Sequence, residues 1–247
     1  MSDKNINNSR RSFVQNTAVA AAGITIVPGV FLHTVAQAKP EDQAVTNSNR
    51  WGILINANKC NDGCTDCVDA CFTENGITSN NRPTTDPQWI RKVKLRDKLT
   101  QHIVSMPMLC QHCEHPPCVD VCPTAASFKR EDGIVLVDRH ICIGCRYCMM
   151  ACPYKARSFV HEEINDQKSY APRGKGTVEG CTMCVHRVDA GGTPACVEAC
   201  TAENHNAMIF GDLKDPNSTI SIELKKNGGK QIRADLNLNT GVRYQGI

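Results

Sequence analysis

Large aromatic side chains are scarce in this chain of 247 residues, where Phe, Trp and Tyr together make up 5%. Because such residues supply much of the buried area in an ordinary core, the composition argues against a fold held together by apolar packing alone. Cysteine is abundant instead, with 16 residues against 17 glycines. We therefore expect a group bound by the cysteines to provide part of the stability.

Signatures of catalysis are missing as well. The sequence contains no G-x-S-x-G, H-E-x-x-H, P-loop or G-x-G-x-x-G pattern, which removes the common signals for hydrolases, metalloproteases and nucleotide binding. No C-x-x-C is followed by His, so the motif for covalent c-type haem is absent. A basic run, "RKVKLRDK" at 91–98, lacks interleaved aromatics and is interpreted as a solvated strand face, which gives nucleic-acid binding little support.

The first 38 residues differ in kind from the rest. Arg10 and Arg11 precede a stretch at 17–35 without Asp, Glu, Lys or Arg, and an A-x-A cleavage site ends at Ala38. This order predicts a twin-arginine export signal and a periplasmic protein. A transmembrane helix is the alternative, against which the glycines, the proline and the short length argue. An uncleaved signal acting as an anchor also stays open.

All the cysteines fall into four groups of four. They are Cys60, Cys64, Cys67 and Cys71; Cys110, Cys113, Cys118 and Cys122; Cys142, Cys145, Cys148 and Cys152; and Cys181, Cys184, Cys196 and Cys200. The third group, with Pro153, matches the C-x2-C-x2-C-x3-C-P run of bacterial ferredoxins, whose fourth cysteine binds a different cluster from the first three. We expect that fourth cysteine to open a helix, with the proline in its first turn.

Groups two and three therefore predict a unit of two 4Fe–4S clusters with crossed ligands, and groups one and four predict another by the same logic. The predicted sets are Cys60, Cys64, Cys67 and Cys200 (cluster 1); Cys71, Cys181, Cys184 and Cys196 (cluster 2); Cys110, Cys113, Cys118 and Cys152 (cluster 3); and Cys122, Cys142, Cys145 and Cys148 (cluster 4). Zinc and disulfides are the alternatives. Structural zinc usually takes two separate C-x2-C knuckles, and bridges between cysteines three apart are strained.

Other polar residues lie beside these motifs. The basic ones are Arg146, Lys155, Arg157, His186 and Arg187. They either tune cluster potentials or offset the negative charge of the thiolates. His112 and His115 lie inside group two, but four thiolates already fill the site. We interpret both histidines as structural or surface residues.

The pattern predicts an α+β fold of duplicated ferredoxin-like modules with long loops. Strands are expected at 50–56, 89–93 and 133–138, and short helices after the fourth cysteine of each group. The expected organisation is a signal peptide at 1–38, a four-cluster domain at 39–212 with an inner module at about 106–160 and an outer module at 50–75 plus 178–210, and a C-terminal arm at 213–247. The arm is expected to form a hairpin or to reach a partner.

The segment "CQHCEHPPCVDVCPTAASFKREDGIVLVDRHICIGCRYCMMACPYKAR" (110–157) resembles the four-cluster, ferredoxin-like electron-transfer subunits of complex iron–sulfur molybdoenzymes. Three further segments, "RWGILINANKC", "APRGKGTVEGCTMCVHRVDAGGTPACVEAC" and "GVRYQGI", resemble periplasmic iron–sulfur subunits of membrane complexes associated with dissimilatory sulfite reductase. Cys60 and Cys64 depart from that family, since three residues separate them where many relatives have two.

The resemblance implies an electron-transfer subunit that is not an enzyme by itself and that holds four 4Fe–4S clusters. The implied partners are a multispan quinone-interacting membrane subunit and a periplasmic multihaem cytochrome c. Two alternatives remain open. One is the iron–sulfur subunit of a periplasmic molybdopterin reductase acting on thiosulfate, tetrathionate or polysulfide. The other is a structural or zinc protein.

Overall fold

The computed structural model describes residues 45–82 and 84–247. The predicted signal peptide and its cleavage site lie outside the described residues. The elements in chain order are β1 (Trp51–Asn56), η2 (Ala57–Lys59), α2 (Asp66–Asn75), β2 (Ile90–Arg96), β3 (Ile103–Leu109), α3 (Pro117–Asp120), β4 (Ser127–Lys129), β5 (Val135–Val137), α4 (Tyr147–Ala151), β6 (Ser158–Phe159), β7 (Val178–Glu179), α5 (Val185–Val188), α6 (Ala195–Ala202), β8 (Met208–Asp212), α7 (Thr219–Asn227), η3 (Ala234–Leu236) and β9 (Val242–Gln245). Within the described part, no helix is both long and apolar enough to cross a membrane.

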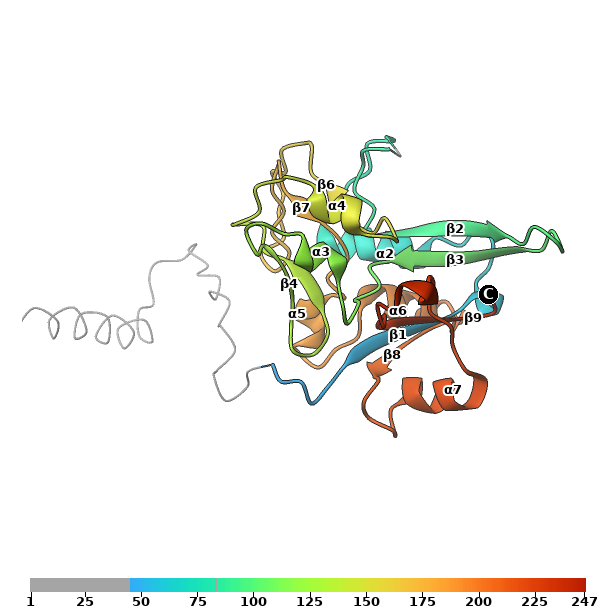
Figure 1. Ribbon diagram of the computed structural model, residues 1–247. Coiled ribbons are helices and arrows are strands. Elements are labelled where there is room, and N and C mark those ends of the chain that lie inside the picture. Colours follow the sequence, from blue (N-terminus) through green and yellow to red (C-terminus); the bar gives the residue numbers. More distant parts are fainter. Residues whose placement is uncertain (1–44, 83) are drawn as a thin grey trace, which may run out of the picture. The chain divides into compact units, whose positions relative to one another are not determined.

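A three-stranded sheet in the order β8–β1–β9 forms the base of the described body (Figure 1). β8 runs antiparallel to β1, and β9 runs parallel to it. Ile53, Leu54 and Ile55 in the central strand are at most 1% exposed. A strand covered on both faces needs an unbroken apolar run, which explains the "ILI" of β1. The predicted strand at 50–56 is confirmed.

The C-terminal segment returns to the body of the protein. Residues 219–227, expected as part of a hairpin or arm, form the helix α7, which packs against β8 and β1. β9 then joins the sheet, with Val242 and Tyr244 fully buried. The Tyr244 hydroxyl accepts a hydrogen bond from Gln111 Nε2 at 3.1 Å, and Gly241 N donates to the carbonyl of Gln111. The C-terminus thus braces the loop that carries Cys110 and Cys113.

Two pairs of packed helices carry many of the cysteines. α2 packs against α6 and α3 against α4. Cys67 and Cys71 lie on α2, and Cys196 and Cys200 lie on α6. Cys118 lies on α3 and Cys148 on α4. Each pair therefore joins two cysteine groups that are far apart in sequence, one pair for the outer groups and one for the inner groups.

We expected a short helix after the fourth cysteine of each group, and this prediction is wrong. α3 ends at Asp120 before Cys122, and α4 ends at Ala151 with Cys152 as an extended C-cap (φ −73, ψ 111). Pro153 follows that cap, because proline cannot continue a helix and keeps the preceding residue out of the helical region. In the outer groups Cys71 and Cys200 lie within α2 and α6. The sequence signal for a helix start was instead Pro117, which occupies the first turn of α3.

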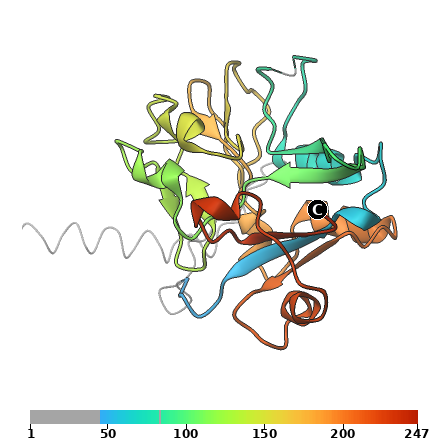
Figure 2. The same cartoon turned by 45° about the vertical axis from the view of Figure 1, so that its right-hand side comes forward.

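A hairpin of β2 and β3 projects from the body (Figures 1 and 2). Its register runs from Ile90 opposite Leu109 to Arg96 opposite Ile103. Residues 94–103 at its outer end are exposed, which confirms a solvated face for most of the basic run. The strand predicted at 133–138 is also confirmed as β5, which pairs with β4.

Candidate iron–sulfur centres

The ligands predicted for cluster 1 line one small pocket. Cys60 and Cys64 come from the loop before α2, Cys67 from α2 and Cys200 from α6. Gly63, with φ of 87°, allows the turn between Cys60 and Cys64. The extra residue between these two cysteines therefore leaves both sulfurs at the same pocket.

The ligands predicted for clusters 2 and 4 also come together, in two separate small pockets. The first is lined by Cys71, Cys181, Cys184 and Cys196. The second is lined by Cys122, Cys142, Cys145 and Cys148. In the second, Gly144 has φ of 69°, and an added Cβ would lie 2.1 Å from the carbonyl oxygen of Gly176. Only glycine fits this turn without moving the neighbouring loop.

The ligands predicted for cluster 3 also lie close together. Cys110, Cys113 and Cys152 form one buried cluster, and the Cys118 thiol interacts electrostatically with both Cys110 and Cys113. All four are at most 8% exposed. The structure thus places Cys152 beside the first three cysteines of group two, as the crossed scheme requires.

The four sets form a series. Cys67 and Cys71 connect the first set to the second along α2. Cys181 of the second set packs against Cys110, Cys113 and Cys152 of the third. Cys118 of the third set and Cys148 of the fourth share a buried cluster. Neighbouring sets are in contact through at least one cysteine, so the thiols form a continuous series through the described body.

Hydrogen-bond donors point at the fourth cysteine of every group. Cys122 Sγ accepts from Ser127 N at 3.3 Å, Cys152 Sγ from Ala156 N at 3.5 Å and Cys200 Sγ from Ala207 N at 3.3 Å. Cys71 Sγ receives the side-chain amide of Asn75 at 3.7 Å. Such donors stabilise anionic sulfur and are one means of setting cluster potentials.

The chemistry of this donor set fits 4Fe–4S clusters. Each set offers four thiols, the number that a cubane binds. Burial raises the pKa of the Cys67 and Cys110 thiols to about 12, so these ligands would be protonated without a metal. Binding iron would deprotonate them and offset the mutual repulsion of the thiolates. None of the sixteen cysteines, all of which are described, forms a disulfide.

The five basic residues singled out from the sequence have different surroundings. Arg146 lies over the Phe159 ring at 3.8 Å, and Lys155 is exposed. His186 and Arg187 both pair with Glu74, at 2.7 and 3.3 Å. Arg157 is the one that contacts a cysteine, with an Nη2–Sγ distance of 3.3 Å to Cys118.

Sequence reasoning missed other polar contacts. Lys92, assigned to a solvated strand face, donates from Nζ to Cys60 Sγ at 2.7 Å. Asp66 and His205 pair at 3.1 Å, and both lie within 4.8 Å of the Cys64 sulfur. The alternation of β2 could have indicated that Lys92 points to one side with Lys94, but its partner is set by tertiary packing. Nothing local in the sequence connects His205 to group one.

His112 is fully buried, and its ring accepts a hydrogen bond from the protein backbone. Its Nδ1 accepts a hydrogen bond from Val135 N at 3.0 Å, and burial, followed by the charge of Arg157, lowers its pKa to about 3. The ring is therefore neutral, with its proton on Nε2. That buried N–H has no hydrogen-bond partner among the described residues. His115, by contrast, is exposed.

Known proteins resemble this chain over most of its length. A family model described as a 4Fe-4S dicluster domain matches residues 101–213. The "Hdr-like menaquinol oxidoreductase iron-sulfur subunit 1" of Archaeoglobus fulgidus is 42% identical over 265 residues, covering 96% of this chain and 97% of that protein. A subunit of the tetrathionate reductase of Salmonella typhimurium is 40% identical over 227 residues, covering 90% and 81%. "Protein NrfC" of Escherichia coli is 38% identical over 225 residues, covering 88% and 86%.

Proposed function

Because the chain belongs to the family of 4Fe–4S electron-transfer subunits of larger oxidoreductase complexes, we propose that it relays electrons between a periplasmic multihaem cytochrome c and a quinone-interacting membrane subunit. In this proposal it is the DsrO type of subunit, in a DsrMKJOP complex of dissimilatory sulfur metabolism. It has no substrate chemistry of its own. The likeness to a menaquinol oxidoreductase subunit supports the link to the quinone pool.

The observation that carries the proposal is the series of four cysteine sets. Four 4Fe–4S clusters would supply one-electron redox chemistry along it. The residues of this chain hold each position through four thiols, exclude water by burying most of those thiols, and direct N–H groups at sulfur. A linear series in which each set contacts the next suits a relay between two different partners.

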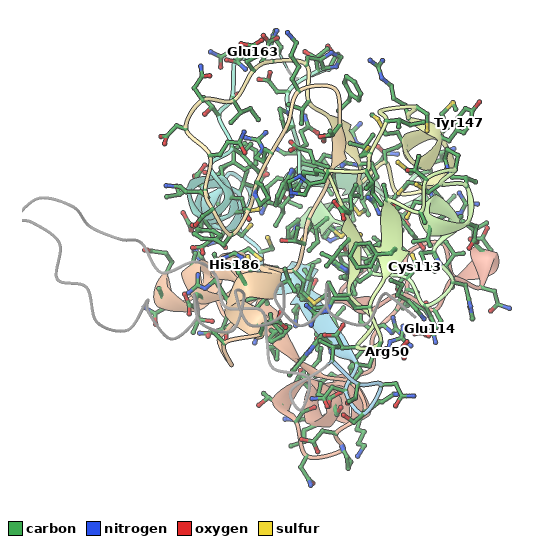
Figure 3. The ribbon with its side chains drawn as sticks, turned by 90° about the vertical axis from the view of Figure 1, so that its left-hand side faces the viewer. Arg50, Cys113, Glu114, Tyr147, Glu163 and His186 are labelled. Atoms are coloured by element: carbon green, nitrogen blue, oxygen red, sulfur yellow. The ribbon has the colours of Figure 1, made fainter. Side chains whose placement is uncertain are left out.

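The two ends of the series are the most open. Cys60 and Cys64 are half-buried at one end, and Cys145 at the other is the exposed cysteine of the sixteen. Exposed apolar side chains lie near Cys145 in the sequence, including Ile143 at 67%, Met150 at 66% and Tyr147 at 53% exposure. Tyr147 is labelled at the surface in Figure 3. Apolar residues gathered at a surface mark contacts with other proteins, which supports a docked partner at this end.

The partners test the proposal directly. We expect anaerobic pull-down from detergent-solubilised native membranes to recover a covalent multihaem cytochrome and a multispan membrane protein, without molybdenum. Mass spectrometry, haem staining and metal analysis of the same sample provide the readout. Recovery of a large molybdenum subunit would replace this function with the second candidate, the iron–sulfur subunit of a periplasmic molybdopterin reductase. The likeness to the tetrathionate reductase of Salmonella typhimurium favours that candidate.

We also propose that the protein reaches the periplasm through the twin-arginine route. The double substitution Arg10→Lys and Arg11→Lys should leave the full-length precursor in the cytoplasm, because this route recognises the arginine pair. Cell fractionation and immunoblotting measure the distribution, and Lys4→Arg, outside the pair, serves as the control. Normal export of the double variant would rule out this route.

A further inference from the structure

Arg157 is a buried cation placed between two of the cysteine sets. It directly precedes β6 and is 7% exposed. Its Nη2 donates to Cys118 Sγ on α3 at 3.3 Å, and its charge also interacts with the thiols of Cys110 and Cys148. Cys110 and Cys118 belong to the set of cluster 3, and Cys148 belongs to that of cluster 4.

The charge of Arg157 is not balanced by a carboxylate. Among the described residues no ion pair includes it, whereas Arg173 pairs with Glu179, and Arg130 pairs with Asp132 and Asp189. A buried cation without a counter-ion is costly. The sulfurs of Cys110, Cys118 and Cys148, which would be thiolates once iron is bound, are the groups that would offset the charge of Arg157.

Other groups nearby do not duplicate this role. His112 Nδ1 accepts a hydrogen bond from Val135 N at 3.0 Å, so the ring carries no positive charge. Arg139 lies over the Trp89 ring at 5.2 Å and donates to the carbonyl of Pro172. The thiol with which Arg139 interacts is that of Cys142, in the fourth set. Arg157 therefore acts on sulfurs of two sets at once.

We propose that Arg157 is a positioning residue that raises the midpoint potentials of the clusters held by Cys110, Cys113, Cys118 and Cys152 and by Cys122, Cys142, Cys145 and Cys148. This inference rests on the proposed function, since it needs both clusters. One-electron reduction adds negative charge to a cluster, and a buried cation stabilises that charge more strongly than it would in water. Net charge and hydrogen bonds to sulfur are two of the means by which proteins set these potentials. The cluster with Cys118 should be affected more, because it receives both the charge and the hydrogen bond.

Three substitutions separate charge from hydrogen bonding. Arg157→Lys keeps the charge, Arg157→Gln keeps a donor without the charge, and Arg157→Met removes both. The matched control is Lys155→Gln, which removes the same charge from an exposed position two residues away, where water screens it. All variants are purified anaerobically as full chains with their clusters, and redox titrations are followed by electron paramagnetic resonance.

We expect Arg157→Gln and Arg157→Met to reduce the equilibrium constant for one-electron reduction at least tenfold at one cluster, a downward shift of about 59 mV. A second potential should fall by less, and the other two should stay at the values of the native protein. Arg157→Lys should lie close to the native protein. The inference is overturned if all four potentials in Arg157→Met match those of Lys155→Gln, or if Arg157→Lys shifts as far as Arg157→Met. A native chain without four cluster signals would contradict the proposed function instead, so the two failures are distinguishable.

Discussion

Cys152→Ser should alter or abolish the cluster assigned to Cys110, Cys113 and Cys118, and should leave the cluster of its own sequence group intact. Cys152 is the C-cap of α4, in an extended conformation. Its side chain is buried with Cys110 and Cys113, and its sulfur accepts a hydrogen bond from Ala156 N. A serine there offers a poorer ligand for iron at that position.

Comparing three single variants shows which cluster each cysteine binds. Electron paramagnetic resonance of reduced, anaerobically purified protein should show that Cys152→Ser and Cys118→Ser lose the same signal. Cys148→Ser should lose a different one, because it belongs to the set of Cys142 and Cys145. If Cys152→Ser instead reproduced the spectrum of Cys148→Ser, the crossed ligand scheme would be wrong for the inner groups.

Most of the candidate site could be predicted from the cysteine spacing, because cluster binding constrains cysteines that are close together in the sequence. Three thiols on one short loop must face a common centre, and the fourth is displaced along the chain. That constraint holds whether or not the flanking helix is placed correctly. The helix was predicted on the wrong side of the fourth cysteine, because proline is common both in the first turn of a helix and just beyond its end. Cys152 shows that the second case applies here.

Contacts between residues far apart in the sequence could not be predicted from the spacing of the cysteines. The segment "GVRYQGI" is too short to be predicted as a buried strand. It nevertheless contains β9, which pairs with β1, almost two hundred residues earlier in the chain. Lys92 looked like part of a solvated run, but the hairpin carries it to Cys60. Arg157 stood beside the motif with Lys155, and only packing distinguishes the buried residue from the exposed one. Potentials depend on such packing, so their determinants are visible only in three dimensions.

The buried pair of Arg173 and Glu179 connects the inner and outer parts of the described body. Arg173 donates from Nε and Nη2 to both oxygens of Glu179 at 2.9 Å, and from Nη1 to the carbonyl of Gly76 at 2.7 Å. Gly76 caps α2, whose cysteines serve the outer sets. Glu179 is 0% exposed and follows Val178, whose N–H donates to Cys142 Sγ. The pair therefore holds segments that position cysteines of three of the four sets.

Arg173→Met should destabilise the protein by about 3–5 kcal/mol, because it leaves the buried Glu179 carboxylate without its ion-pair partner. We expect the temperature at which the visible cluster absorbance is lost to fall on the order of 10 °C, measured at one fixed scan rate because loss of a cluster is not reversible. Arg233→Met is the control, since its pair with Asp235 is exposed and contributes little. The double variant Arg173→Met, Glu179→Leu should recover much of the loss, because an apolar pair of similar volume can replace a buried ion pair. A double variant no more stable than Arg173→Met would show that the arginine acts through its bond to Gly76 rather than by neutralising Glu179.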